Sequence, residues 1–452
     1  MEQDLTQGPV TGTMLRFALP MILGNLLQQL YNMADTLIVG RVLGTAALGA
    51  VGSAYTLMTF LTSVLLGLAM GSGAVFSIRW GRRDLEGLRE SVCASFVLIA
   101  ALTVVLSVVS FLWLDGILRL LQVPMENYDL MRRYLWVILY GLPATFLYNF
   151  FACLLRGVGN STAPLVLLAV AAVTNIVLDL LFVMGFSWNV EGAAVATVIA
   201  QYLSGIGLLI YTLRRFPELR PAARHWRKCG QRLREISSFS LLTCVQQSVM
   251  NFGILMVQGR VNSFGSGVMA AFAAAVKIDS FAYMPVQDFG NAFSTFIAQN
   301  YGARKPERIR KGLRSAVIAA VLFCLGISAG VCLFARPLMG IFVAAEEAEI
   351  IAIGVTYLRI EGAFYLGIGC LFLLYGLYRA LAMPAMSVVL TVISLGTRVA
   401  LAYTLSAIPA VGVLGIWWSV PIGWLLADVT GFAYYRLRRK AIEARLFSAQ
   451  SQ

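Results

Sequence analysis

The sequence predicts an all-α membrane protein with about twelve transmembrane helices in two six-helix bundles, and three observations lead to this fold class. Of the 452 residues, 59% are hydrophobic and only 13% are charged, whereas soluble domains carry about 25% charged residues. Uncharged stretches long enough to cross roughly 30 Å of hydrocarbon recur along the chain. The second half of the chain then repeats residue patterns of the first half.

Twelve apolar segments predict the individual helices, and their ends are defined to within several residues. The uncharged run 42–78 is longer than an upright span needs, which predicts a tilted or extended second helix. The predicted helices lie near residues 15–41, 46–79, 89–114, 132–155, 164–186, 191–213, 237–260, 267–300, 312–335, 350–379, 384–406 and 413–436.

The net charge of +13 is concentrated in particular loops. The loops between the basic ones are short or rich in acids, such as 187–191 and 344–349. This alternation is typical of the positive-inside rule, which places basic loops in the cytoplasm. We therefore expect a multi-pass protein of the cytoplasmic membrane with both termini inside, surrounded by lipid and without a nucleic-acid partner. The basic clusters fall within residues 79–89, 214–234, 304–314 and 436–445.

One long polar segment, residues 214–236, divides the chain. It is basic and holds Pro217 and Pro221, so it predicts a cytoplasmic linker. The expected domains are an N-terminal six-helix lobe over 1–213, the linker over 214–236, a C-terminal six-helix lobe over 237–440 and a cytoplasmic tail over 441–452.

The two lobes repeat each other in sequence. Because each lobe holds an even number of crossings, the lobes should share one orientation and be related by a pseudo-two-fold axis along the membrane normal, as parallel repeats with a midplane substrate site. The matched positions are Gln28-Gln29 with Gln246-Gln247, Gly40 with Gly259, Arg156 with Arg379 and Gly192 with Gly415.

A polar stripe runs along the first predicted helix. Asn25, Gln28, Asn32 and Asp35 follow one another at steps of three or four residues, which places them on one helix face. Ionisable groups inside a span are costly and face a cavity or a partner, so Asp35 is a candidate functional group.

The fifth and sixth helices supply polar groups at the same depth. Asn175 and Asp179 are four residues apart and share a face, and Thr197 is the polar group near the outer end of the sixth helix. Counting from the helix ends places Asp35, Asp179 and Thr197 roughly 9–10 Å below the outer surface. Such oxygens suit a proton or a hard cation, including Na⁺ at Asp35 and Asp179. The alternative is that these groups only join neighbouring helices by hydrogen bonds.

The C-terminal lobe lacks this acidic cluster, because the repeat places Arg398 opposite Asn175 and Ala402 opposite Asp179. Two positive and two negative side chains inside its helices predict a neutral buried network instead. Direct contact of these charges with a substrate or a cation is the alternative. The four residues are Lys277, Asp279, Glu361 and Arg398.

Amide side chains recur in the first and seventh helices and are candidates for the wall of a substrate cavity. Pro20 predicts a kink in the first helix below Asp35. The sequence contains no Walker motif, no Ser-His-Asp arrangement and no Cys/His metal spacing, so we expect no cofactor, no enzymatic activity and transport driven by an ion gradient. The amides are Gln28, Asn32, Gln247 and Asn251.

Several motifs resemble the multidrug and toxic compound extrusion (MATE) family over about residues 14–440. The resemblance implies two six-helix bundles that form a V around a central cavity. The motifs are Asp35-Thr-Leu-Ile-Val-Gly-Arg-Val-Leu-Gly in the first helix, Arg156-Gly-Val-Gly-Asn-Ser-Thr-Ala-Pro after the fourth, Asn175-Ile-Val-Leu-Asp179 in the fifth and Glu191-Gly-Ala-Ala in the sixth.

The resemblance also implies a function. Proteins of this family look like antiporters that exchange H⁺ or Na⁺ for cationic, amphiphilic drugs. Pro20 matches the bending proline of proton-coupled prokaryotic members, and similarity to those members implies a cation site. Its residues would be Asp35, Asn175, Asp179 and Thr197, with Tyr134 in the same network.

The choice between H⁺ and Na⁺ stays open at this point. Sodium-coupled members place an acid on the seventh helix, and this chain has none between Glu235 and Arg260. Glu361 on the tenth helix nevertheless loosely fits those members.

We therefore expect a monomeric multidrug exporter of organic cations. A lipid-linked oligosaccharide or lipid flippase of the same broad superfamily is the alternative, and it would show a more basic cavity and often extra helices. A membrane-embedded enzyme would need a catalytic constellation that the sequence does not offer.

Overall fold

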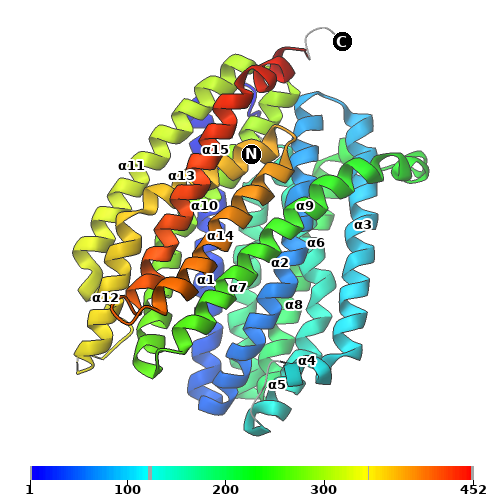
Figure 1. Cartoon of the computed structure of the whole chain (residues 1–452). Coiled ribbons are helices and arrows are strands. Elements are labelled where there is room, and N and C mark those ends of the chain that lie inside the picture. The colour runs from blue at the N-terminus through cyan, green and yellow to red at the C-terminus, as the bar shows by residue number, and fades with distance from the viewer. Residues whose placement is uncertain (1–2, 121–124, 345, 449–452) are drawn as a thin grey trace. The chain divides into compact units, whose positions relative to one another are not determined.

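The structure, a computed structural model, describes residues 3–120, 125–344 and 346–448 (Figure 1). Among the described helices, ten are long and apolar enough to cross a membrane, and the bent pair α12 (Ala348–Ala363) and α13 (Tyr365–Ala380) adds an eleventh span. The last predicted span corresponds to α15 (Leu414–Ser448). The all-α membrane fold that the composition predicts is confirmed. Of the predicted outer loop 344–349 and the predicted tail, residues 345 and 449–452 lie outside the described residues.

The chain folds into two compact units. Unit 1 comprises Met1–Asp4 and Leu23–Cys244, and unit 2 comprises Leu5–Ile22 and Val245–Gln452. The division therefore passes through two helices, α1 (Val10–Leu43) and α9 (Ala223–Asn262).

Unit 1 contains the helices between these two. The predicted fourth span is two helices, α5 and α6, because Pro143 lacks a backbone N–H and stands in the first turn of α6. The helices are α2 (Thr45–Gly81), α3 (Leu85–Leu112), α4 (Leu114–Leu120), α5 (Met125–Ile138), α6 (Leu142–Gly157), α7 (Thr162–Asp179) and α8 (Val190–Arg215), with 3-10 turns at Leu139–Gly141 and Pro217–Leu219 and a π-helical turn at Leu180–Gly185.

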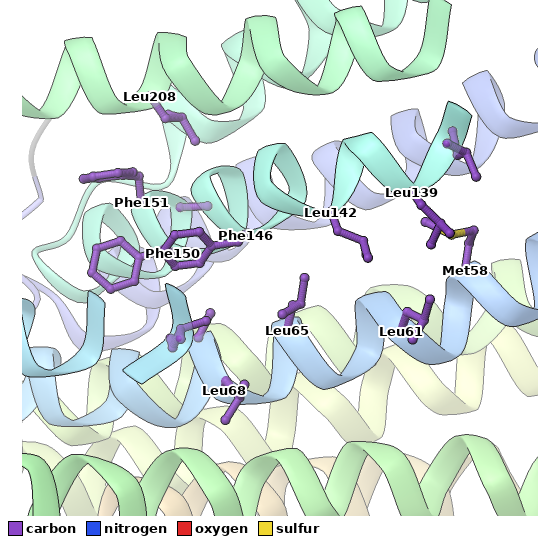
Figure 2. Close-up of a cluster of buried hydrophobic side chains, with 14 of the residues drawn as sticks. Met58, Leu61, Leu65, Leu68, Leu139, Leu142, Phe146, Phe150, Phe151 and Leu208 are labelled. Carbon is purple, nitrogen blue, oxygen red and sulfur yellow. The ribbon is translucent and has the colours of Figure 1, made fainter. Parts of the chain in front are cut away.

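An apolar core holds α2 against α6 and α8 against α6 and α7. Leu61 and Leu65 are four residues apart on α2 and face the segment that carries Leu139 and Leu142, whereas Leu68 points to the other side of α2 (Figure 2). Residues four apart share one face of a helix, so this leucine pair helps fix how α2 meets α6. This core fixes α6, and through it α8 and α7, which carry the polar side chains described below.

The basic linker predicted over 214–236 is folded onto unit 1. It forms the 3-10 turn Pro217–Leu219 and then enters α9. Arg89 Nε donates to the carbonyl oxygen of Glu218 over 2.7 Å, His225 Nε2 lies 2.9 Å from Glu86 Oε2, and Arg232 Nε donates to Glu90 Oε2 over 3.0 Å. Acids at the start of α3 thus dock the linker.

Unit 2 repeats the packing of unit 1. In unit 2, α10 packs on α11 and α13, just as α2 packs on α3 and α6 in unit 1. Likewise, α14 packs on α15 as α7 packs on α8. The backbone repeats as well: Gly44 before α2 and Gly265 before α10 have φ of 88° and 101°, a conformation that glycine adopts without strain. The remaining helices of unit 2 are α10 (Ser266–Gly302), α11 (Pro306–Met339) and α14 (Pro384–Ser406).

Candidate functional site

Four helices of unit 1 converge on one polar site. Asp35 comes from α1, Tyr134 from α5, Asn175 and Asp179 from α7, and Thr197 from α8. Asp179 is the last residue of α7 before the backbone widens into the π-helical turn Leu180–Gly185. Turns of this kind occur frequently at functional sites, because they re-aim side chains within a helix.

Hydrogen bonds join α7 to α8 at this site. Asn175 Nδ2 donates to Thr197 Oγ1 over 3.3 Å, and Thr197 Oγ1 donates to the carbonyl oxygen of Ala193 over 3.0 Å. These bonds use the amide nitrogen of Asn175 and leave its oxygen, Oδ1, buried without a donor. The amide is therefore oriented with its acceptor free.

The carboxyl groups of Asp35 and Asp179 lie close enough to influence each other directly. Two carboxylates have no donor between them, so a hydrogen bond between these groups would require a proton on one of them. No N–H or O–H group elsewhere in the described chain donates to Asp35 Oδ1 or to either oxygen of Asp179. The site is therefore lined by oxygens that lack donors.

The pair is also without a neutralising cation. Asp179 is 0% exposed, and burial and the other carboxyl are the main influences on each acid. No described arginine or lysine is among them. The phenol of Tyr134 is itself buried and lies close enough to interact electrostatically with both carboxyls. Two like charges close together in a low dielectric do not both ionise readily, so the pair is suited to hold a proton.

The described residues contain no group of three or more His, Cys, Asp and Glu that could hold a metal ion. Hard cations take about six or more oxygen ligands. Na⁺ at Asp35 and Asp179 would need further oxygens, such as Asn175 Oδ1 and water, whereas a proton needs only one carboxylate oxygen. The donor set suits a proton without additional ligands.

The other predicted cavity residues are partly buried in their own units. Gln28 and Asn32 lie on the unit 1 part of α1, and Gln28 bonds to Tyr31. Gln247 and Asn251 lie on the unit 2 part of α9. Their role as a cavity wall stays a prediction. Pro20 lies inside α1, in unit 2 and two residues before the division of that helix at Ile22.

Unit 2 has a second buried acidic cluster. Tyr365 Oη donates to Asp279 Oδ1 over 2.7 Å, and Asp279 is hydrogen-bonded to Glu361. Arg398 Nη2 lies 3.9 Å from Glu361 Oε1. Tyr357 completes the group through a bond to Glu361.

Lys277 does not join this cluster, and the predicted four-residue network is corrected to three charged members. Its side chain is exposed, and its ammonium nitrogen lies 5.9 Å from the centre of the Phe342 ring. Lys277 and Asp279 are two residues apart on α10, so they point to different faces of the helix. Two carboxyls and one guanidinium remain, and neutrality of the cluster requires one bound proton.

Three residues near these sites were not predicted from the sequence. Tyr357 and Tyr365 contact the unit 2 acids, and aromatic residues in apolar spans carry no distinctive signal. Asp428 on α15 is 8% exposed. The sequence does carry a sign of Asp428, because an acid inside the predicted twelfth helix, 413–436, is a candidate functional group.

Known proteins share both the sequence and the fold. The profile of the MatE family matches residues 20–181 and 240–404. The probable multidrug resistance protein YpnP of Bacillus subtilis is 30% identical over 96% of this chain and 97% of its own length. The FAD transporter of Shewanella oneidensis is 25% identical over 97% and 96%. An outward-facing multidrug resistance MATE family transporter superimposes with a TM-score of 0.90 at 24% identity, covering 98% of both chains.

The match of the family profile covers most of both repeats, and the relatives extend over nearly the whole chain. The all-helical membrane fold and its internal repeat agree with these likenesses. The chain therefore belongs to the MatE family of multidrug efflux transporters.

Proposed function

We propose that this protein exports organic cations across the cytoplasmic membrane in exchange for protons, and that Asp35 and Asp179 hold the exchanged proton. One observation carries the proposal: the half-buried carboxyl of Asp35 and the buried carboxyl of Asp179 lie close together without a basic partner. Na⁺ is the alternative coupling ion, and the test below separates the two.

The pair supplies a simple basis for exchange. With one shared proton it carries a single negative charge, and with two protons it is neutral. A cationic drug near the site is attracted more strongly to the pair with fewer protons, so drug binding favours proton release. By linkage, protonation then weakens drug binding by the same factor. Proton and drug thus compete for the same charge, which couples the two fluxes.

The proposal includes the orientation of the chain in the membrane and its oligomeric state. The basic loops support a cytoplasmic location for both termini. All five residues of the proposed cation site belong to unit 1 of one chain, so a monomer is sufficient for the function.

Transport in proteoliposomes tests the proposal. Efflux of a fluorescent organic cation, such as ethidium, is measured with a pH gradient and with a Na⁺ gradient in turn. We expect efflux on the pH gradient, loss of it in Asp35→Asn and Asp179→Asn, and retention in Asp115→Asn. Asp115 is a matched control because its exposed carboxylate pairs with Arg132 and not with a residue of the proposed site. Efflux at the wild-type rate in Asp35→Asn would refute the role of Asp35 as a proton carrier. Efflux on the Na⁺ gradient alone would identify Na⁺ as the coupling ion.

The substrate class is tested in the same vesicles. One relative is named an FAD transporter, so a flavin nucleotide and a labelled lipid are the competing substrates. We expect several organic cations to be exported and neither competitor. Export of the flavin, or flipping of the lipid, without export of any cation would contradict the proposed substrates.

A further inference from the structure

The span of unit 2 that α12 and α13 form together is broken. Helices α12 and α13 meet at an angle of 51° at Phe364. Glu361 stands in the last turn of α12, and Tyr365 opens α13 with its bond to Asp279. Broken spans recur at ion sites of secondary transporters, because interrupted helices free backbone groups inside the membrane.

A further acid lies against the first turn of α13. The Oδ2 atom of Asp428, on α15, is 3.7 Å from the point that a Cβ of Gly367 would occupy. Gly367 is three residues past the break, and it has no side chain to cover the carboxyl. The Cβ of Trp424 is 3.4 Å from the same point. The carboxyl group of Asp428 therefore lies at the contact between α15 and the first turn of α13.

The carboxyl of Asp428 has no basic partner among the described residues. It is 8% exposed, and its Oδ1 accepts no hydrogen bond. Two titratable groups face it, the Cys370 thiol and the Tyr375 phenol, both on α13. From α14, Thr391 bonds to Tyr375, and no described residue of α12 or α14 adds a charge against Asp428.

We propose that Asp428 is a proton-binding site of unit 2, separate from the Asp35–Asp179 pair. An ionised carboxylate here would be a bare charge in a low dielectric, whereas the protonated acid is neutral. Na⁺ does not fit, because one carboxyl, one phenol and one thiol offer too few oxygens. Only the use of this proton in transport rests on the proposed function.

A hydrophobic carbodiimide tests the site, since such reagents modify protonated carboxyls in apolar surroundings. The full-length protein in lipid nanodiscs is treated with dicyclohexylcarbodiimide between about pH 5 and about pH 9, and the modified residue is located by mass spectrometry. We expect labelling of Asp428 that falls several-fold as the pH rises. No labelling at any pH, or equal labelling across the range, would overturn the proposal.

Controls separate this site from the first. The hydrogen bond from Arg132 holds the pKa of the Asp115 carboxyl below its usual value, so Asp115 should stay unlabelled. Asp428→Asn should remove the label, and Asp428→Glu should keep it with a shifted pH dependence if the asparagine variant fails to fold. Asp35→Asn, which tests the proposed function, should leave the labelling of Asp428 unchanged.

Discussion

The hydroxyl of Thr197 has two bonds in the unit 1 site, one from Asn175 and one to Ala193. Thr197→Val removes both with little change of shape and leaves a buried amide unpaired, which costs about 1–3 kcal/mol. We expect a several-fold loss of efflux driven by a pH gradient. Thr197→Ser keeps the hydroxyl and should restore most of the rate. Equal activity in the valine and serine variants would show that the bond does not position Asn175.

Arg398 is the one cation of the unit 2 acidic cluster among the described residues. Its removal leaves Asp279 and Glu361 without a positive charge, and breaking a buried pair costs about 3–5 kcal/mol. Arg398→Gln should therefore lower the melting temperature more than Glu361→Gln does, and the double variant should lose less than the sum.

Lys277→Gln is the matched control for the comparison of the Arg398 and Glu361 variants, because Lys277 is an exposed cation of the same unit outside the cluster. It should change the free energy of unfolding by no more than about 0.5 kcal/mol. Strictly additive losses of Arg398→Gln and Glu361→Gln would argue against their contact.

At the scale of elements, glycines let α2 approach α9 within unit 1. A Cβ at Gly71 would lie 2.4 Å from the carbonyl oxygen of Phe239, and one at Gly67 would lie 2.6 Å from the Cα of Cys244. Gly71→Ala should lower the melting temperature, since overpacking costs about 1–3 kcal/mol. Gly52→Ala on the same helix meets nothing within 4 Å and should be neutral or slightly stabilising. The same effect for both variants would contradict the close contact.

The docked linker gives a second prediction for an element. Glu86 pairs with Arg224 and His225, so Glu86→Gln should raise hydrogen exchange over residues 217–236 several-fold. Glu218→Gln is the control, because Glu218 binds Arg89 through its backbone carbonyl and not its side chain. Unchanged exchange in Glu86→Gln would mean that apolar contacts alone hold the linker.

At the scale of the whole molecule, orientation in the membrane can be tested by cysteine labelling. In a cysteine-free background, an impermeant reagent added to intact cells should label Glu346→Cys and spare Gly230→Cys, and both positions are exposed. Permeabilised cells should label both. Labelling of Gly230→Cys from outside would reverse the topology. Position 225 would be a poor probe, because His225 is 1% exposed.

Much of this architecture can be predicted from local sequence. Helical spacing places Asn175 and Asp179 on one face, and counting residues from helix ends puts Asp35 and Thr197 at their depth. The structure brings these four side chains together in unit 1. Hydrophobic length alone locates nearly every span, because lipid requires each crossing to be long and apolar.

What the sequence does not predict depends on contacts between distant segments. Residues 5–22 belong to unit 2, where Asn300 and Arg308 donate to the carbonyl oxygen of Leu5, and Lys305 donates to that of Thr6. Backbone acceptors leave no trace in residue type. The break at Phe364 has no proline to announce it, so the tenth span was predicted as one helix.

Proton release on drug binding tests the central claim most directly. Purified protein in a weakly buffered solution near neutral pH is mixed with an organic cation, and the pH change is followed with a soluble indicator. We predict that wild-type protein and Asp115→Asn release protons in proportion to the drug bound, and that Asp35→Asn and Asp179→Asn bind drug without release. Drug binding without any proton release in the wild-type protein, or undiminished release in both asparagine variants, would contradict the account.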